Sequence, residues 1–492
     1  MPRWHASRTA AARGELGSLA APHELLRQPE LLADKTAAWH ANRSLSFAAD
    51  LVSTALLTES TDDAREAAAF LVEQSGTSST ALALAQRLLN PDGPARETID
   101  VIGAAGLSPE VRHAEIRRLR RQLRESPRNA LAWADLAHEY ASLGLVEKAL
   151  RSMDTALRLV PTSRFLLRSG ARLFVHADDP ERALRLLRQA GRTNADPWLM
   201  AAEIATSGVA SRSPKFARRG KAALAMDVAP RHKTELASAL ATLEWMSGDN
   251  RSARRLFRDS LIDPTENAVA QAEWASRRLN ASLVEPHHLE TPGSFEARAR
   301  ESLRRGRFEE ALDNSWNWLH DQSFSRDPAG VGSYVAAVAL RDYEQSIRIL
   351  QLGLVANPAD WLLLNNMAFA LASLNRLDEA QDHLNRIVGE RDPTSLAVTS
   401  ATQGLVQFRR GNVQLGRDRY KEAIRALLKG NFKKSAAVAA VFWAREELLT
   451  RQEAAKEAVR RAAELAKKEQ APEIQGWLRA LEAGLSGNEP PA

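Results

Sequence analysis

The stretch from Ala130 to Pro161 combines large and small side chains at the spacing of two successive helices. Its large members are Trp133, Leu136, Tyr140 and Met153, and its small members are Ala137, Gly144, Ala149 and Ala156. Small residues at such positions let two antiparallel helices approach closely, while the large residues fill the space between them. One hairpin of this kind cannot bury its apolar face alone, so we expect further hairpins to stack on both sides of it.

This stretch resembles the tetratricopeptide repeat, whose pattern begins W-x2-L-G-x2-Y and spans about 34 residues. Looser units follow, and the turns between their helices at Gly306, Arg341 and Asn375 recur at about that period. The resemblance covers residues 130–430 well and the flanks poorly. It implies an all-α solenoid, a right-handed superhelix of helical hairpins that binds a protein partner in its concave groove.

The composition favours the same fold class. Ala, Leu, Arg and Glu are abundant, which favours helix, and no long alternating β-branched run predicts a sheet. The absence of Cys excludes disulfides, thiolate zinc sites and cysteine nucleophiles. No apolar run approaches a membrane span of about 20 residues, and the start has no apolar core of the length that a secretory signal needs. We therefore expect no membrane contact and a cytoplasmic protein; the Arg-rich and Ala-rich composition suggests a bacterial type.

Turn chemistry divides the chain into segments. We expect a flexible start at residues 1–22 and an irregular helical capping region at 23–126, with helices at 45–58, 62–74, 79–90, 95–105 and 109–125. A junction at 281–293 separates the two halves of the repeat array, 127–280 and 294–470. A capping helix at 471–485 and a disordered tail at 486–492 follow.

Sequence signatures of catalysis are missing. The chain contains no G-x-x-x-x-G-K-[ST] loop, no H-E-x-x-H and no G-x-S-x-G. The adjacent His287 and His288 lie in the junction, and adjacent imidazoles point apart in most backbones, which favours solvent-facing histidines over metal ligands. We therefore predict no catalytic residue, no metal and no cofactor.

The resemblance also implies a set of groove residues. In the family, certain positions of the first helix of each hairpin point into the groove. Carried over to this chain, those positions are His138, Ser142, Arg168, Arg172, His176, Arg300, Arg304, Val331, Val335, Asn365, Phe369, Leu405 and Phe408. The set is polar and basic at one end and apolar at the other, which suits a peptide with an acidic part and a hydrophobic part. An alternative is that Phe369 and Phe408 belong to the core of their hairpins.

A second candidate surface is the arginine cluster of residues 112–128. Arg117, Arg118, Arg120, Arg121 and Arg124 would suit a phosphate or an acidic partner. Leu119 and Leu123 run through the cluster at helical spacing, so a solvated face of an amphipathic helix explains it as well. The formal net charge of +6 permits an acidic partner without requiring one.

Three functions follow from these patterns. The leading hypothesis is a non-catalytic scaffold or adaptor that binds a protein partner in a hetero-complex, with a homo-oligomer left open. The alternative is a nucleic-acid-binding solenoid that uses its arginine-rich helical faces, whose binding would fall steeply with salt. The third is an enzyme whose active site lies within residues 23–125.

Overall fold

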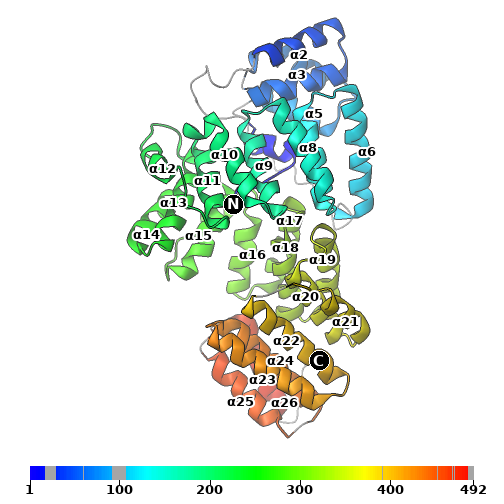
Figure 1. Cartoon of the computed structure of the whole chain (residues 1–492), viewed down its shortest axis with the longest axis vertical. Coiled ribbons are helices and arrows are strands. Elements are labelled where there is room, and N and C mark those ends of the chain that lie inside the picture. The colour runs from blue at the N-terminus through cyan, green and yellow to red at the C-terminus, as the bar shows by residue number, and fades with distance from the viewer. Residues whose placement is uncertain are drawn as a thin grey trace. The chain divides into compact units, whose positions relative to one another are not determined.

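The computed structural model describes residues 1–16, 29–58, 60–90, 107–389, 392–451, 453–467, 469 and 471–485. These residues form helices and turns, with no β-strand among them, which confirms the all-α class (Figure 1). The chain divides into two compact units, Met1–Ala297 and Arg298–Ala492. The division falls just after the expected junction at 281–293. The expected helix at 95–105 and the tail at 486–492 lie outside the described residues.

The helices of the first unit are α1 (Ser7–Ala12), α2 (Pro29–Ala41), α3 (Leu45–Thr58), α4 (Arg65–Glu73), α5 (Ser79–Leu89), α6 (Pro109–Glu125), α7 (Ala130–Ser142), α8 (Val146–Leu159), α9 (Arg164–His176), α10 (Pro180–Gln189), α11 (Pro197–Val209), α12 (Ala217–Ala223), α13 (Thr234–Met246), α14 (Asn250–Asp259) and α15 (Glu266–Arg278). Short 3-10 segments are η2 (Asp62–Ala64), η4 (Gly191–Asn194), η5 (Pro230–His232) and η6 (Pro286–Glu290).

Helix α16 (Phe295–Arg304) crosses the boundary between the units. The second unit continues with α17 (Phe308–Asp321), α18 (Arg326–Tyr334), the π-helical turn η7 (Val335–Ala339), α19 (Tyr343–Ala356), α20 (Trp361–Ser373), α21 (Leu377–Asn385), α22 (Pro393–Arg409), α23 (Val413–Lys429), α24 (Lys433–Leu449), α25 (Ala455–Ala466) and α26 (Pro472–Leu485).

Successive helices pack in pairs, as the repeat pattern predicts. In the first unit α7 packs on α8, α9 on α10 and α13 on α14, while the first helices α7, α9, α11 and α13 also contact one another in sequence. In the second unit the pairs are α18 with α19, α20 with α21, α22 with α23 and α24 with α25, and the first helices α18, α20, α22 and α24 again form a row. The tetratricopeptide-like hairpin array is therefore confirmed within each unit.

The predicted turns between helices adopt left-handed backbone conformations. Gly306, Arg341 and Asn375 have φ of 75°, 61° and 64°. A left-handed residue just past the end of a helix lets the next amide groups bond back to the last turn, which ends the helix sharply. Gly and Asn adopt this conformation at little cost, whereas Arg341 is less well suited to it. The repeat period is thus fixed by local turn chemistry as well as by the apolar pattern.

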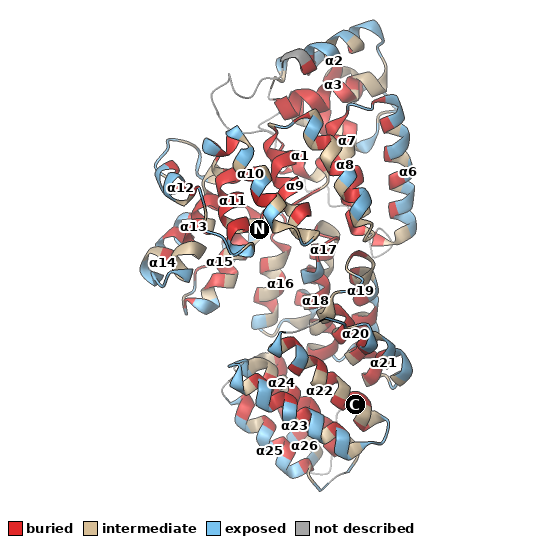
Figure 2. Ribbon diagram, viewed as in Figure 1, coloured by how far each residue is buried: buried red, intermediate tan, exposed pale blue. Residues whose placement is uncertain are grey.

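Residues 1–16, which belong to the start that the sequence predicts to be flexible, are buried or half-buried against the helices of the first unit. Trp4, Ala10 and Ala11 are fully buried, and α1 packs on α5 and α7 (Figure 2). The segment buries one large indole beside the charged side chains of Arg13 and Glu15, and it covers helix surface that would otherwise face water. Repeat patterns do not reveal such a segment because it belongs to no repeat.

Candidate functional site

The face of α7 that the resemblance assigns to the groove is covered by residues 1–16, which we call the 1–16 segment. The indole of Trp4 meets the His138 ring edge-on, with 5.0 Å between the ring centres. The backbone N–H of Ser7 donates to one carboxylate oxygen of Asp135 at 2.6 Å, and the Ser7 hydroxyl donates to the other at 2.5 Å. Ser142, one turn after His138, is also buried and donates its hydroxyl to the His138 carbonyl. In this structure the predicted groove residue His138 and its neighbour Asp135 therefore contact the chain's own segment.

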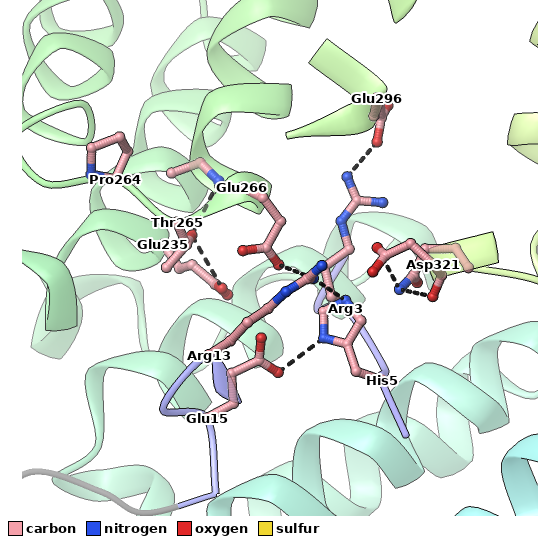
Figure 3. A network of polar contacts seen from close by, with 12 residues as sticks. Arg3, His5, Arg13, Glu15, Glu235, Pro264, Thr265, Glu266, Glu296 and Asp321 are labelled. Carbon is pink, nitrogen blue, oxygen red and sulfur yellow. Dashed lines mark hydrogen bonds and ion pairs between the residues drawn. The ribbon is translucent and has the colours of Figure 1, made fainter. Parts of the chain in front are cut away.

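A buried chain of polar contacts fixes the rest of the 1–16 segment (Figure 3). A guanidinium nitrogen of Arg13 lies 2.8 Å from His5 Nε2, and His5 Nδ1 lies 3.1 Å from a carboxylate oxygen of Glu15. Arg13 also lies 3.8 Å from Glu266 of α15. Burial raises the pKa of Glu15, but His5, Arg168 and Arg13 together more than offset this and bring that pKa below its ordinary value. Burial raises the pKa of Glu266.

His5, Glu15 and Glu266 bring three metal-binding side chains close together, with their ligand atoms within 4.8 Å of one another. The guanidinium of Arg13 lies within the same group, since it contacts both His5 and Glu266. The positive charge beside these three side chains is therefore the Arg13 guanidinium. The arrangement is that of a buried ion-pair network, which holds the 1–16 segment against α15.

The predicted groove residues of α9 are also engaged within the first unit. Arg168 is buried, donates to both carboxylate oxygens of Glu235 at 2.8 and 2.7 Å, and lies 4.3 Å from the centre of the Trp198 ring. Arg172 and His176 are half-buried. Burial, with the positive charge of Arg172 second, lowers the pKa of His176 to about 4, so His176 is neutral at physiological pH. The basic end expected for the groove is thus largely neutralised inside the protein, which corrects the expectation for Arg168.

In the second unit the closing helix α26 covers the corresponding face. The indole N–H of Trp477 donates to the carbonyl of Val338 in η7 at 2.6 Å, and its ring lies 5.1 Å from the Phe442 ring of α24. Glu473 accepts a hydrogen bond from the Tyr334 hydroxyl at 3.0 Å and forms an ion pair with Lys434 at 2.7 Å. The predicted closing helix therefore packs on the row of first helices.

The apolar groove residues predicted in the second unit belong mostly to its core. Val335, Leu405, Phe408 and Asn365 are buried, and Phe408 packs beside Tyr420 of the paired helix α23. The sequence predicted that these four side chains line the groove, whereas the structure places them in the core. A helix between two layers buries residues on more than one side. Phe369 is half-buried with its ring 4.8 Å from that of Phe442, and Val331 is half-buried.

The two predicted arginines of α16 differ in exposure. Arg300 is half-buried, with its guanidinium 5.5 Å from the centre of the Trp318 ring. Arg304 is exposed and forms an ion pair with Glu301 one turn earlier. Neither observation tests whether these residues contact a partner, so their role stays a prediction.

An open cavity of about 480 Å³ lies on the other side of α7, between α6 and α8. At 100° per residue, Trp133, Leu136 and Tyr140 point away from the side of α7 that carries Asp135, His138 and Ser142. Leu123 and Leu136 are buried in the cavity floor, and the half-buried Trp133 and Tyr140 complete it. Four basic side chains also line it: Arg120 and Arg124 from α6, and Lys148 and Arg151 from α8. We call these four residues the basic rim.

The arginines of α6 are not equivalent. Arg118 forms two hydrogen bonds with Glu115, at 2.8 and 2.5 Å, so its charge is balanced locally. Arg117, Arg120, Arg121 and Arg124 are exposed. Within the part of the chain that the structure describes, no carboxylate forms an ion pair with Arg120, Arg124 or Arg151. The arginine cluster found in the sequence thus supplies half of the basic rim, whereas Lys148 and Arg151 were missed because they lie in the next hairpin.

Comparisons with known proteins give only distant likenesses. No family model matches the chain, and no curated protein matches it. Among solved structures, yeast Tom70 is 13% identical with a TM-score of 0.32, covering 78% of this chain and 96% of that one. The human IFIT1 dimer with PPP-AAAA is 12% identical with a TM-score of 0.34, covering 98% and 99%. A tetratricopeptide repeat protein from Parabacteroides merdae is 13% identical with a TM-score of 0.25, covering 63% and 98%. At such TM-scores the fold class rests on the helix packing seen in this protein.

Among the described helices, none is both long enough and apolar enough to cross a membrane.

Proposed function

We propose that this protein is a non-catalytic scaffold of helical hairpins that binds a protein partner, and that the partner binds at the cavity between α6 and α8. The observation that carries the proposal is the basic rim, in which Arg120, Arg124 and Arg151 have no ion-pair partner within the described residues. Exposed cations beside an apolar floor are the composition expected of a recognition surface. We also propose that the protein is cytoplasmic, as the sequence suggests.

The lining of the cavity supports binding over catalysis. Its polar groups are guanidinium, ammonium and hydroxyl groups, and the lining contains neither a carboxylate nor an imidazole that could act as a general base at neutral pH. Glu266, Glu235 and Asp135 lie outside this lining and are engaged by Arg13, Arg168 and Ser7, respectively. The chemistry of the cavity is therefore suited to holding a charged ligand in place.

The concave faces are poorer candidates than the sequence indicated. A partner in the first unit would have to displace the 1–16 segment with its buried Trp4, and a partner in the second would have to displace α26 with its buried Trp477. Burial of an indole contributes several kcal/mol, about 3–5 by the cost of Trp→Ala changes. The cavity between α6 and α8 requires no such displacement.

Photo-crosslinking tests the proposal. A benzophenone amino acid replaces Arg124 or Arg151, one at a time so that the other rim cations remain, and the cells that make the protein are irradiated. The matched control carries the same amino acid at Arg255, an exposed arginine of α14 in the same unit. We expect crosslinks to a polypeptide from the two rim positions and none from Arg255.

Two outcomes would overturn the proposal. Crosslinked products whose added mass is removed by nuclease would assign the cavity to a nucleic acid, which is the alternative left open by the arginine cluster. Equal crosslinking at the rim and at Arg255 would show that the cavity is no preferred site. Crosslinks to a second copy of this chain would make the partner another protomer.

A further inference from the structure

The two sides of the cavity carry like charges on fixed helical faces. Arg120 and Arg124 are four residues apart on α6, and Lys148 and Arg151 are three apart on α8, so each pair lies on one face of its helix. Both pairs line the same cavity. The ammonium of Lys148 lies 5.7 Å from the centre of the Tyr140 ring. Within the described residues, the three arginines of the basic rim have neither an aromatic nor an acidic partner. A ligand placed between α6 and α8 therefore meets positive charge on both sides.

The floor of the same cavity is apolar. Leu123 and Leu136 belong to a buried cluster with Ile116 and Leu119, and Trp133 packs against it. The volume of about 480 Å³ lies within the range of about 300–1,000 Å³ typical of ligand pockets. A large apolar side chain that entered the cavity would be removed from water, while charges on either side of it would reach the basic rim.

The aromatic rings are arranged for packing and not for base stacking. The Trp133 indole N–H donates to the carbonyl of Pro127 at 2.9 Å, and the ring packs against the leucine cluster. The ammonium of Lys148 lies over the Tyr140 ring. Proteins that bind single-stranded nucleic acids use open aromatic faces on which successive bases stack. Here the Tyr140 ring already carries Lys148 and Trp133 is half-buried against the leucine cluster, so the observations favour a peptide.

We infer that the cavity between α6 and α8 binds an acidic peptide segment in which Asp or Glu residues flank one large apolar side chain. The apolar side chain occupies the floor, and carboxylates on both sides of it form ion pairs with Arg120 and Arg124 on α6 and with Arg151 on α8. This inference rests on the proposed function and specifies the chemistry of the partner. It places the binding surface on the side of α7 opposite to the one covered by the 1–16 segment.

Fluorescence anisotropy with defined probes tests the inference on the full-length protein. The probe is a fluorescein-labelled short peptide with a central Phe flanked by Asp and Glu. Matched probes carry Asn and Gln in place of the acids, or Ala in place of Phe, and a labelled oligo-dT supplies a single-stranded nucleic acid. We expect the acidic Phe peptide to bind at least roughly tenfold more tightly than either altered peptide, and more weakly as salt rises.

A pair of charge-reversal variants locates the binding site. Arg120→Glu with Arg151→Glu changes both sides of the rim, and Arg255→Glu with Arg258→Glu makes the same charge change on α14. All four side chains are exposed, so both variants are expected to keep the helical circular dichroism of the wild type. The rim variant should bind the acidic peptide roughly tenfold or more weakly, and the α14 variant should bind it within about twofold of wild type.

Three results would overturn the inference. They are equal binding of the acidic and neutral peptides, equal loss in the two variants, or tighter binding of oligo-dT than of the acidic peptide at physiological salt. Crosslinking of a polypeptide at Arg124 or Arg151 does not depend on the charge of that polypeptide. If the peptide test fails while such crosslinking succeeds, the acidic chemistry is wrong and the scaffold function stands; if both fail, the site itself is wrong.

Discussion

The contact between Ser7 and Asp135 predicts a specific pH dependence of stability. Asp135 is half-buried, and burial raises its pKa to about 6 even though the two bonds donated by Ser7 favour the ionised form. In the unfolded chain a carboxyl group of this type has a pKa near its ordinary value of 3.8. The folded state therefore holds the Asp135 proton more tightly than the unfolded state does. The contribution of Asp135 to stability is therefore greatest at acid pH and falls as the pH rises through the window from about 4 to about 6.

The size of the effect follows from the shift. About two pKa units at about 1.4 kcal/mol each give up to about 3 kcal/mol, and water that reaches a half-buried side chain reduces this. The change Asp135→Asn removes the titrating group and keeps an oxygen that accepts the Ser7 backbone bond. As the pH rises from 4 to 7, the free energy of unfolding of the wild type should therefore fall by about 1–3 kcal/mol relative to that of Asp135→Asn.

Two measurements check the prediction. Urea denaturation followed by circular dichroism over this pH range gives the global stability, although two compact units need not unfold together. Hydrogen exchange of the Ser7 amide reports local opening of the 1–16 segment. Asp259→Asn, a change of an exposed carboxylate on α14, is the control, and its profile should run parallel to that of the wild type. If the profile of Asp135→Asn also runs parallel to that of the wild type, or if Asp135→Asn loses stability relative to the wild type as the pH rises, the raised pKa assigned to the half-buried Asp135 is wrong.

Three further predictions concern packing and titration. Trp4→Ala should lower the free energy of unfolding of the first unit by about 3–5 kcal/mol, measured by urea denaturation, because a fully buried indole is lost. Gly416→Ala should destabilise the second unit by about 1–3 kcal/mol in urea denaturation, because the new Cβ would lie 2.5 Å from a ring carbon of Phe408. Gly476→Ala, whose new Cβ would have nothing within 4 Å, should be neutral or stabilising in the same experiment. Burial lowers the pKa of His176 to about 4, so its titration lowers the free energy of unfolding by up to about 3 kcal/mol as the pH falls from 6.5 to 4. In urea denaturation at each pH, His176→Gln should lose less stability than the wild type over this range. An equal loss in the two proteins would contradict the assignment.

Local sequence chemistry predicted the helices closely. The expected helices at 45–58 and 109–125 match α3 and α6, and the hairpin of residues 130–161 is formed by α7 and α8. Helix boundaries follow from residues within one turn of the end, such as Ser108 and Pro109 at the start of α6, where the Ser108 hydroxyl accepts the Val111 N–H. These interactions involve near neighbours in the sequence, so their pattern is visible without coordinates.

The candidate site was predicted only in part. The sequence reveals Arg120 and Arg124 as members of an arginine cluster and indicates a packing role for Trp133. It does not indicate that Trp133 and Arg151 line the same cavity as these arginines. The predicted concave residues Leu405 and Phe408 are core residues, because family position alone does not state how deeply a hairpin is packed. A cavity exists where three helices leave space between them, and that space depends on how the helices pack.

The sequence by itself determined that this chain forms helical hairpins, where their turns lie and which helix carries an arginine-rich face. Periodicity and turn chemistry act over one or two helical turns, so the order of residues is sufficient to establish them. Only the tertiary structure decided which surfaces remain open. Trp4 covers α7 and Trp477 covers the π-helical turn η7 through contacts between residues more than a hundred positions apart. Such contacts depend on shape and charge that arise after the hairpins have stacked, and they leave the basic rim exposed.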